Sequence, residues 1–281
     1  MSSLFDNIRK HILNKAGDVE ESVKNTKWWK NNENGVQEKT QEAMKYLDDL
    51  TKDAQFHSAQ HPEAIPSIAK DGKIIGYFDS PHSTYHEGKG YGWNRKIVGD
   101  ENFGYGDTPV KGDTREKYGF VTNAMTPIED EDLADGFGYG EYIFDFNPNK
   151  MKGNTTMTTG DSMMFYDDGV SPIIAGDKNS YWNTFKGDRA EPLTREGFEG
   201  ALGRKPSPYM EFQYHGPLSL DNAIGLYAPR KGLLRGDIKR GLDKISDDYK
   251  IPLYDMNGCY KNCEDFDPSK LLINPEHRSK K

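Results

Sequence analysis

The chain has 281 residues, which is enough for one large domain or for one domain with an appendage. Only 34% of the residues are hydrophobic, whereas glycines (29) and aromatic residues (12%) are plentiful, which favours a loop-rich fold with short strands over a helical bundle. The net charge of −8 argues against a globally basic surface that coats nucleic acid, although it does not exclude a local basic groove.

The first fifty residues predict two amphipathic helices. Apolar residues recur at helical spacing from Leu4 to Leu13, and a second helical pattern runs from Val36 to Leu50 after an Asn-rich break. Trp28 lies beside Trp29 in polar sequence between them, which indicates docking either onto the main domain or onto a partner. We therefore expect residues 1–52 to be a helical lid or partner-binding region and residues 53–281 to be the main domain. The alternative is that this region completes the core.

Short strands and turns dominate the chain after Ala54. The pattern predicts a short helix that begins at Pro62 or Pro66 and stops at Asp71-Gly72, and a long loop region over residues 76–113. A turn is expected at residues 147–149 and a short helix or strand over 218–227. The predicted strands cover residues 55–58, 118–122, 140–146 and 155–159.

The segment from Pro208 to Leu218 is a further predicted strand, and it places a carboxylate among large apolar residues. Desolvating a carboxylate is costly, so Glu211 is expected to have a partner or a chemical role. At strand spacing Tyr209, Glu211, Gln213 and His215 share one face. The alternative is an edge strand with a solvated polar face.

Common catalytic and metal motifs are missing from the sequence. Cys259 and Cys263 lack the two further ligands that a zinc site needs, and we expect two unpaired thiols of a cytosolic protein. His82 and His86 lie in a Gly-rich segment that gives no support to a metal site. The glycines of residues 88–92 match neither a dinucleotide fingerprint nor a P-loop. No metal is expected.

The first residues show no secretory signal, and no segment approaches the roughly 18 apolar residues of a membrane span. We therefore expect a cytoplasmic protein that does not bind a membrane.

Three segments, taken in their order along the chain, resemble the mono-ADP-ribosyltransferase toxins. Phe56-His57-Ser58 with the helix ending at Gly72 resembles the opening motif of that family, in which a strand bears His or Arg before a small hydroxyl residue. Residues 155–162 are similar to its Ser/Thr-rich second motif, and residues 211–218 to its third motif, which carries a catalytic Glu. The resemblance covers about residues 55–227, and no single motif is specific alone.

The resemblance implies an α+β fold, with an ADP-ribosyltransferase-like split β-sandwich core and an N-terminal helical appendage. It implies NAD as co-substrate and Glu211 as the catalytic residue that faces an oxocarbenium-like ribose. A macromolecular acceptor (protein or nucleic acid) and a toxin–antitoxin or antiviral role follow, with an antitoxin that contacts the N-terminal region. The implied NAD-binding residues are His57, Ser58, Tyr118, Thr158 and Ser162, the acceptor-side residues are Tyr209 and Gln213, and further candidates to stack on nicotinamide are Tyr139, Tyr142 and Phe165.

Departures from the family pattern leave alternatives open. Tyr209 stands where an arginine-directed transferase would more usually carry an acidic residue, which puts arginine as acceptor in doubt. A second alignment places Gln213 in the catalytic slot, but Gln cannot supply the carboxylate. His57 places the chain nearer the His-Tyr-Glu class than the Arg-Ser-Glu class, while Ser162 allows a mixed type. The alternative functions are an NAD glycohydrolase and a catalytically silent binding module.

Overall fold

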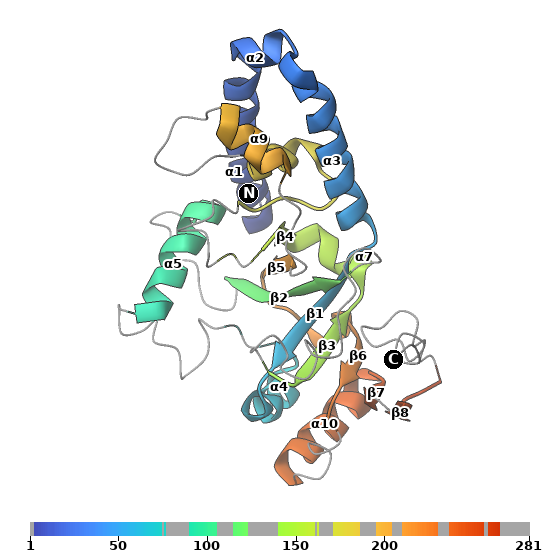
Figure 1. Ribbon diagram of the computed structural model, residues 1–281. Coiled ribbons are helices and arrows are strands. Elements are labelled where there is room, and N and C mark those ends of the chain that lie inside the picture. Colours follow the sequence, from blue (N-terminus) through green and yellow to red (C-terminus); the bar gives the residue numbers. More distant parts are fainter. Residues whose placement is uncertain are drawn as a thin grey trace.

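The computed structural model combines a layer of helices with one β-sheet (Figure 1). This mixture belongs to the α+β class that the sequence predicts. The structure describes residues 3–74, 76, 90–105, 115–122, 140–160, 162, 171–185, 195–203, 210–229, 236–255 and 258–264, with the side chains of residues 90–95 excepted.

The N-terminal part of the chain forms the long helices α1 (Leu4–Lys24) and α3 (Val36–Lys52), joined through the short α2 (Lys27–Lys30). Ser3 starts α1 with a capping box, because its hydroxyl accepts from the Asp6 amide and the Asp6 carboxylate accepts from the Ser3 amide. The chain reverses through left-handed backbone at Asn32, Asn34 and Gly35, a conformation that Asn and Gly tolerate best. The two predicted helices are confirmed.

Eight strands form a single sheet in the order β4-β5-β2-β1-β3-β6-β7-β8. All neighbouring pairs are antiparallel except β6 and β7. The predicted strands over 55–58, 118–122, 140–146, 155–159 and 208–218 are present with adjusted ends. The bounds are β1 Gln55–Gln60, β2 Glu116–Thr122, β3 Tyr142–Phe146, β4 Thr155–Thr158, β5 Met210–His215, β6 Ala223–Tyr227, β7 Leu253–Asp255 and β8 Gly258–Lys261.

The central strands β1 and β2 pair over only part of their length. Their register covers three residue pairs, from Gln55↔Thr122 to His57↔Phe120, whereas β2 extends back to Glu116. Gly119 lies at the point of closest approach, where a Cβ would stand 2.2 Å from the carbonyl oxygen of His57. Only glycine fits at that position without moving β1 away from β2.

Two further helices, α4 (Ile65–Asp71) and α10 (Gly236–Tyr249), pack against each other. The first, α4, follows a 3₁₀ turn that begins at Pro62, and it stops at Gly72, whose positive φ of 67° closes the helix as predicted. At the contact with α10, a Cβ at Gly72 would clash with the Tyr249 hydroxyl. The other helical elements are η1 Glu33–Gly35, η2 Pro62–Ala64, α5 Gly90–Phe103, α7 Pro148–Met151, η7 Lys152–Asn154, η9 Lys178–Phe185, α9 Arg195–Gly203 and η10 Leu220–Asn222.

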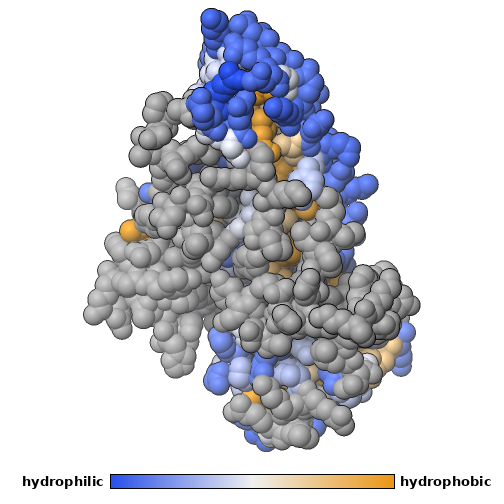
Figure 2. Space-filling model, viewed as in Figure 1, coloured by the Kyte–Doolittle hydropathy of each residue, from blue (hydrophilic) through white to orange (hydrophobic). Residues whose placement is uncertain are grey.

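The N-terminal helices share a buried core with the sheet. Val23 from α1 and Leu50 from α3 belong to the same apolar cluster as Phe56 and Phe212. On the view in Figure 2 the tip around α2 is hydrophilic, and an apolar strip runs below it. These contacts favour the expectation that residues 1–52 pack on their own domain.

The tryptophan pair docks within the chain. The Trp28 ring lies 5.2 Å from that of Phe198 on α9, and the Trp29 ring lies 5.8 Å from that of Trp182 in η9. Both tryptophans are partly buried against the core. Of the two docking surfaces that the sequence allows, the structure shows the one within the chain.

Two expectations from the sequence are wrong, and one alternative is excluded. Residues 90–103 form α5, where a loop is predicted. The turn predicted at residues 147–149 is present as the start of the helical turn Pro148–Met151, which Asn147 caps. β5 lies between β4 and β2 with all six residues buried, which excludes the alternative of an edge strand. Cys259 and Cys263 form a disulfide instead of remaining free thiols, which removes the cysteine argument for a cytosolic protein.

Candidate functional site

One face of the sheet carries a row of side chains that crosses five strands. Thr158 pairs with Glu211, Glu211 with Phe120, Phe120 with His57, and His57 with Asp145, in successive registers from β4 to β3. Residues paired across strands point to the same face, so these five side chains share one surface.

Most side chains on this surface are polar. Side chains alternate between the two faces along a strand, so residues two or four positions from the row on the same strand also lie on this surface. We call the surface the polar face, and its polar members are Thr156 and Thr158 on β4, Glu211, Gln213 and His215 on β5, Glu116, Tyr118 and Thr122 on β2, Gln55 and His57 on β1 and Asp145 on β3. All but Gln55 and Tyr118 are buried, so their stability there depends on their hydrogen bonds.

Glu211 lies at the end of a chain of hydrogen bonds on β4 and β5. Its Oε1 accepts from Gln213 Nε2 at 2.8 Å, and the same Nε2 donates to Thr158 Oγ1 at 3.1 Å. Gln213 Oε1 accepts from Thr156 Oγ1 at 3.0 Å. Thr156 Oγ1 also lies 2.9 Å from His215 Nε2, and His215 Nδ1 lies 2.9 Å from the Tyr105 hydroxyl. The Gln213 amide thus has a partner for every polar hydrogen and for its oxygen.

The donors in this chain can be assigned by elimination. Thr156 donates its one hydroxyl proton to Gln213, so it must accept in its hydrogen bond with His215. The imidazole proton therefore lies on Nε2 of His215. Nδ1 is left as an acceptor for the Tyr105 hydroxyl. Burial, reinforced by the charge of Lys117, lowers the pKa of His215 from 6.5 to about 3, which agrees with a neutral ring.

His57 is held at the other end of the row by its own partners. Its Nδ1 lies 2.6 Å from Asp145 Oδ1, its Nε2 lies 2.8 Å from Thr122 Oγ1, and its ring stacks on Phe120 at 5.2 Å. The Tyr254 hydroxyl donates to the second Asp145 oxygen. Both ring nitrogens of His57 are therefore engaged within the protein, which is the arrangement of a hydrogen-bonded core histidine.

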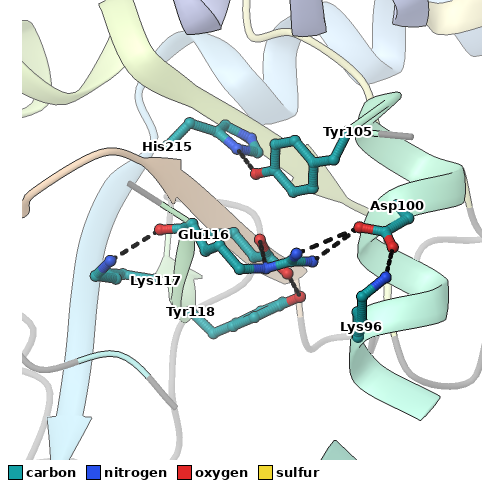
Figure 3. A network of polar contacts seen from close by, with 8 residues as sticks. Lys96, Asp100, Tyr105, Glu116, Lys117, Tyr118 and His215 are labelled. Carbon is teal, nitrogen blue, oxygen red and sulfur yellow. Dashed lines mark hydrogen bonds and ion pairs between the residues drawn. The ribbon is translucent and has the colours of Figure 1, made fainter. Parts of the chain in front are cut away.

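A second buried carboxylate, Glu116, occupies the end of the polar face under α5 (Figure 3). Its Oε1 accepts from the Tyr118 hydroxyl at 3.0 Å, and its Oε2 lies 3.6 Å from Arg115 Nε. The Arg115 guanidinium donates to Asp100 on α5 at 3.3 Å and lies over the Tyr105 ring. Burial, and then the neighbouring Glu116 charge, raise the pKa of Tyr105 well above its usual value, so the phenol keeps its proton.

α5 fits closely over this pair. A Cβ at Gly99 would stand 2.6 Å from Glu116 Oε1 and 2.9 Å from an Arg115 nitrogen, so only glycine lets the helix approach. The ion pair between Asp100 and Arg115, the residue directly before β2, attaches the helix to the sheet, and Lys96 pairs with the same Asp100 within α5. This arrangement explains why a Gly-containing segment becomes a helix.

The structure brings together five of the predicted site residues. Glu211, Gln213, Thr158, His57 and Tyr118 all lie on the polar face.

The other predicted site residues lie elsewhere. Ser58 points to the opposite face, where its hydroxyl donates to the Tyr118 carbonyl, and Tyr142 is buried on that same face. Ser162 follows β4 and is 1% exposed, and its hydroxyl has no hydrogen-bond partner among the described residues. Tyr209, Tyr139, Phe165, His82 and His86 lie outside the described residues.

Several functional candidates are absent from the sequence predictions. Asp145 stands in an apolar strand just as Glu211 does, so the same signal could have found it. Thr156 lies two residues before Thr158 in the predicted strand 155–159, and Glu116 lies two residues before the predicted strand 118–122. Tyr105 belongs to a Gly-rich segment with no periodicity, and nothing in the sequence pairs it with His215.

No group of three or more His, Cys, Asp or Glu side chains that could hold a metal ion is found within the described ranges. None of the described helices has both the length and the apolar character that crossing a bilayer requires.

No model of a protein family matches this chain, and no curated protein shows significant sequence similarity to it.

Proposed function

We propose that this protein transfers ADP-ribose from NAD to an intracellular macromolecule, either a protein side chain or a nucleic-acid base. The observation that carries the proposal is the row on the polar face: Thr158, Glu211 and His57 come from three segments that are far apart in sequence. The same three segments carry the resemblance to the ADP-ribosyltransferase toxins. The split β-sandwich that the resemblance implies remains part of the proposal, since β1 and β2 pair over three residues within one continuous sheet.

In the proposed reaction the bond between the ribose C1′ and the nicotinamide nitrogen breaks. The bonding electrons leave with nicotinamide, which departs as a neutral group, and an oxocarbenium-like ribose remains. The Glu211 carboxylate stabilises the developing positive charge, and the nucleophile of the acceptor then bonds to C1′ and releases its proton. Glu211 suits this task only as an anion, to which Gln213 donates a hydrogen bond.

The residues around Glu211 divide into those that suit NAD binding and those that do not. Thr158 ends β4, and Ser162 follows four residues later. Within the described part of the chain the Ser162 hydroxyl has no hydrogen-bond partner, so it is available to donate to a ribose or phosphate oxygen. His57 has no unengaged ring nitrogen in this arrangement, so it would contact NAD only by exchanging Asp145 or Thr122. Glu211 is 1% exposed, so a ligand reaches it only when part of the structure moves.

The engaged His57 and the buried Glu211 also suit a second candidate, a binding module without catalysis. An assay with NAD labelled in its adenylate half separates the candidates when the protein is incubated with cell extract and, separately, alone. Label on protein or nucleic acid supports the transferase, and release of free ADP-ribose without an acceptor indicates an NAD glycohydrolase. Unchanged NAD in both incubations contradicts the proposal and leaves the binding module.

A toxin–antitoxin or antiviral role remains part of the proposal, with an antitoxin as the partner of the N-terminal region. The described contacts of α1 and α3 with the core leave the outer surface of these helices, hydrophilic at the tip in Figure 2, for such a contact. Co-expression of a candidate antitoxin with the full chain, followed by co-purification, tests this part.

A further inference from the structure

We propose that His215 and Tyr105 are positioning residues, which act through Thr156 and Gln213 to hold the Glu211 carboxylate in place. The inference rests on the proposed function for the role of Glu211 in a reaction. Its structural part, the coupling of Tyr105 to Glu211 through four hydrogen bonds, does not need that function.

The oxygen and the NH₂ group of the Gln213 amide have similar shapes, but the oxygen accepts hydrogen bonds and the NH₂ group donates them. Turned by half a rotation, the amide would present its oxygen to the Glu211 carboxylate, and two acceptors would face each other. Thr156 opposes that rotation, because it donates to the amide oxygen at 3.0 Å. A Thr156 proton that points to the amide oxygen therefore reinforces the orientation of Gln213 that the Glu211 carboxylate itself favours.

The direction of the Thr156 proton depends in turn on His215. A protonated Nε2 makes Thr156 an acceptor on that side and leaves its own proton for Gln213. In the opposite tautomer the proton lies on Nδ1 of His215, and Nε2 becomes an acceptor. The Thr156 hydroxyl could then donate to Nε2 instead of to Gln213. The Tyr105 hydroxyl, which keeps its proton, favours the first tautomer when it donates to Nδ1 at 2.9 Å, and Glu116 is a second acceptor for the same proton.

The surroundings of His215 hold this arrangement rigidly. Its ring packs against Phe5 of α1 at 5.9 Å and Phe103 of α5 at 4.6 Å between ring centres. The charged and titratable groups placed against it are Tyr105, Glu116 and Lys117. A neutral imidazole is the form that these surroundings accept, because Lys117 and burial both disfavour the cation. A catalytic base is not needed to explain why a histidine occupies this position.

The test is a graded series of variants, each of which removes one hydrogen bond between Tyr105 and Glu211, at increasing distance from Glu211. Gln213→Met removes the donor to Glu211, Thr156→Val removes the link before it, and Tyr105→Phe removes the first donor. Thr155→Val is the matched control, because Thr155 is equally buried and points to the other face, where its hydroxyl donates to Met151. Each variant is first checked for a cooperative melt.

Two readouts report on Glu211 directly. The first is its carboxyl pKa, measured by ¹³C NMR with Glu211→Gln for assignment. The second is the acid limb of the pH profile of nicotinamide release. We expect both to move to higher pH, most in Gln213→Met and least in Tyr105→Phe, because a carboxylate that loses a donor binds its proton more tightly. Thr156→Val should also release nicotinamide roughly threefold to tenfold more slowly at neutral pH, the factor of one lost hydrogen bond. Nitrogen chemical shifts should show the proton of His215 on Nε2.

The outcomes separate this inference from the proposed function. If the wild type releases no nicotinamide but the Glu211 pKa follows the graded order, the positioning chain stands and the proposed function fails. If nicotinamide is released and both Thr156→Val and Tyr105→Phe match Thr155→Val in the two readouts, the positioning inference is overturned. If Thr156→Val does not fold, Tyr105→Phe and Gln213→Met decide between the same two results.

Discussion

The two faces of the sheet are built from the same strands, yet they hold the fold together in different ways. On the apolar face Phe56, Met157 and Phe212 join a core to which the N-terminal helices contribute. On the polar face their chain neighbours His57, Thr158 and Glu211 are equally buried, but hydrogen bonds satisfy them. The first face tolerates apolar residues of similar size, whereas the second requires a specific partner for each group. A buried face with specific partners is costly to maintain for stability alone, which is why we place the function there.

The largest effect is expected from deletion of residues 1–52, which removes part of the core of the apolar face. Ala16, Val23, Val36, Leu47 and Leu50 belong to that core, so the truncated chain should lose its cooperative melt in calorimetry. Leu50→Ala should lose about 2–5 kcal/mol, while the exposed Lys45→Ala should lose little. A soluble truncated protein with an intact melt would instead support a segment dedicated to partner binding.

Asp145→Ala tests whether the polar face contributes to stability as well. It should lose about 3 kcal/mol, because two buried donors, His57 Nδ1 and the Tyr254 hydroxyl, lose their acceptor. Denaturant unfolding measures the change, and Asp53→Ala at an exposed helix end serves as control. Equal stability of the two variants would show that the hydrogen bonds of Asp145 to His57 and Tyr254 contribute little to the free energy of unfolding.

Much of this two-faced sheet could be predicted from the sequence, because alternation is a local signal. The strand over Met210–His215 and the shared face of Glu211 and Gln213 follow from spacing alone. α5 could not be predicted, because it depends on Arg115 and on Gly99 fitting over Glu116. The amphipathic spacing of Ile238, Leu242 and Ile245 is a local signal for α10, whereas β7 is too short for any pattern. Which strands are neighbours, and hence the row through His57 and Glu211, depends on long-range pairing that local patterns do not encode.

The pH dependence of stability should reveal His215 on the polar face. Its pKa is about 3 in the folded protein and 6.5 ordinarily, so the unfolded chain takes up the proton first. Its contribution is complete above about pH 6.5 and declines as the pH falls toward about 3. Between about pH 7.5 and about pH 5 the wild type should lose about 2 kcal/mol more than His215→Gln, whose side chain does not titrate. Parallel losses in both proteins would contradict a buried neutral histidine.

The smallest change in stability is expected from Ser162→Ala. The hydroxyl is buried and has no partner among the described residues, so its removal should change the free energy of unfolding by less than about 0.5 kcal/mol. If NAD supplies the missing partner, its affinity should fall roughly threefold to tenfold in calorimetric titration. Ser180→Ala, whose buried hydroxyl bonds Ile174 and Asp177, should behave in the opposite way and lose stability without losing affinity.

The release of nicotinamide from NAD by wild-type protein and by Glu211→Gln tests the central claim most directly. Glutamine keeps the size of the side chain and removes the negative charge, so the rate should fall on the order of 10²–10³ while the melt stays nearly unchanged. Glu196→Gln on the exposed surface of α9 should keep the full rate. Nicotinamide release by Glu211→Gln at the wild-type rate, or none from the wild type itself, would contradict the assignment of catalysis to the polar face.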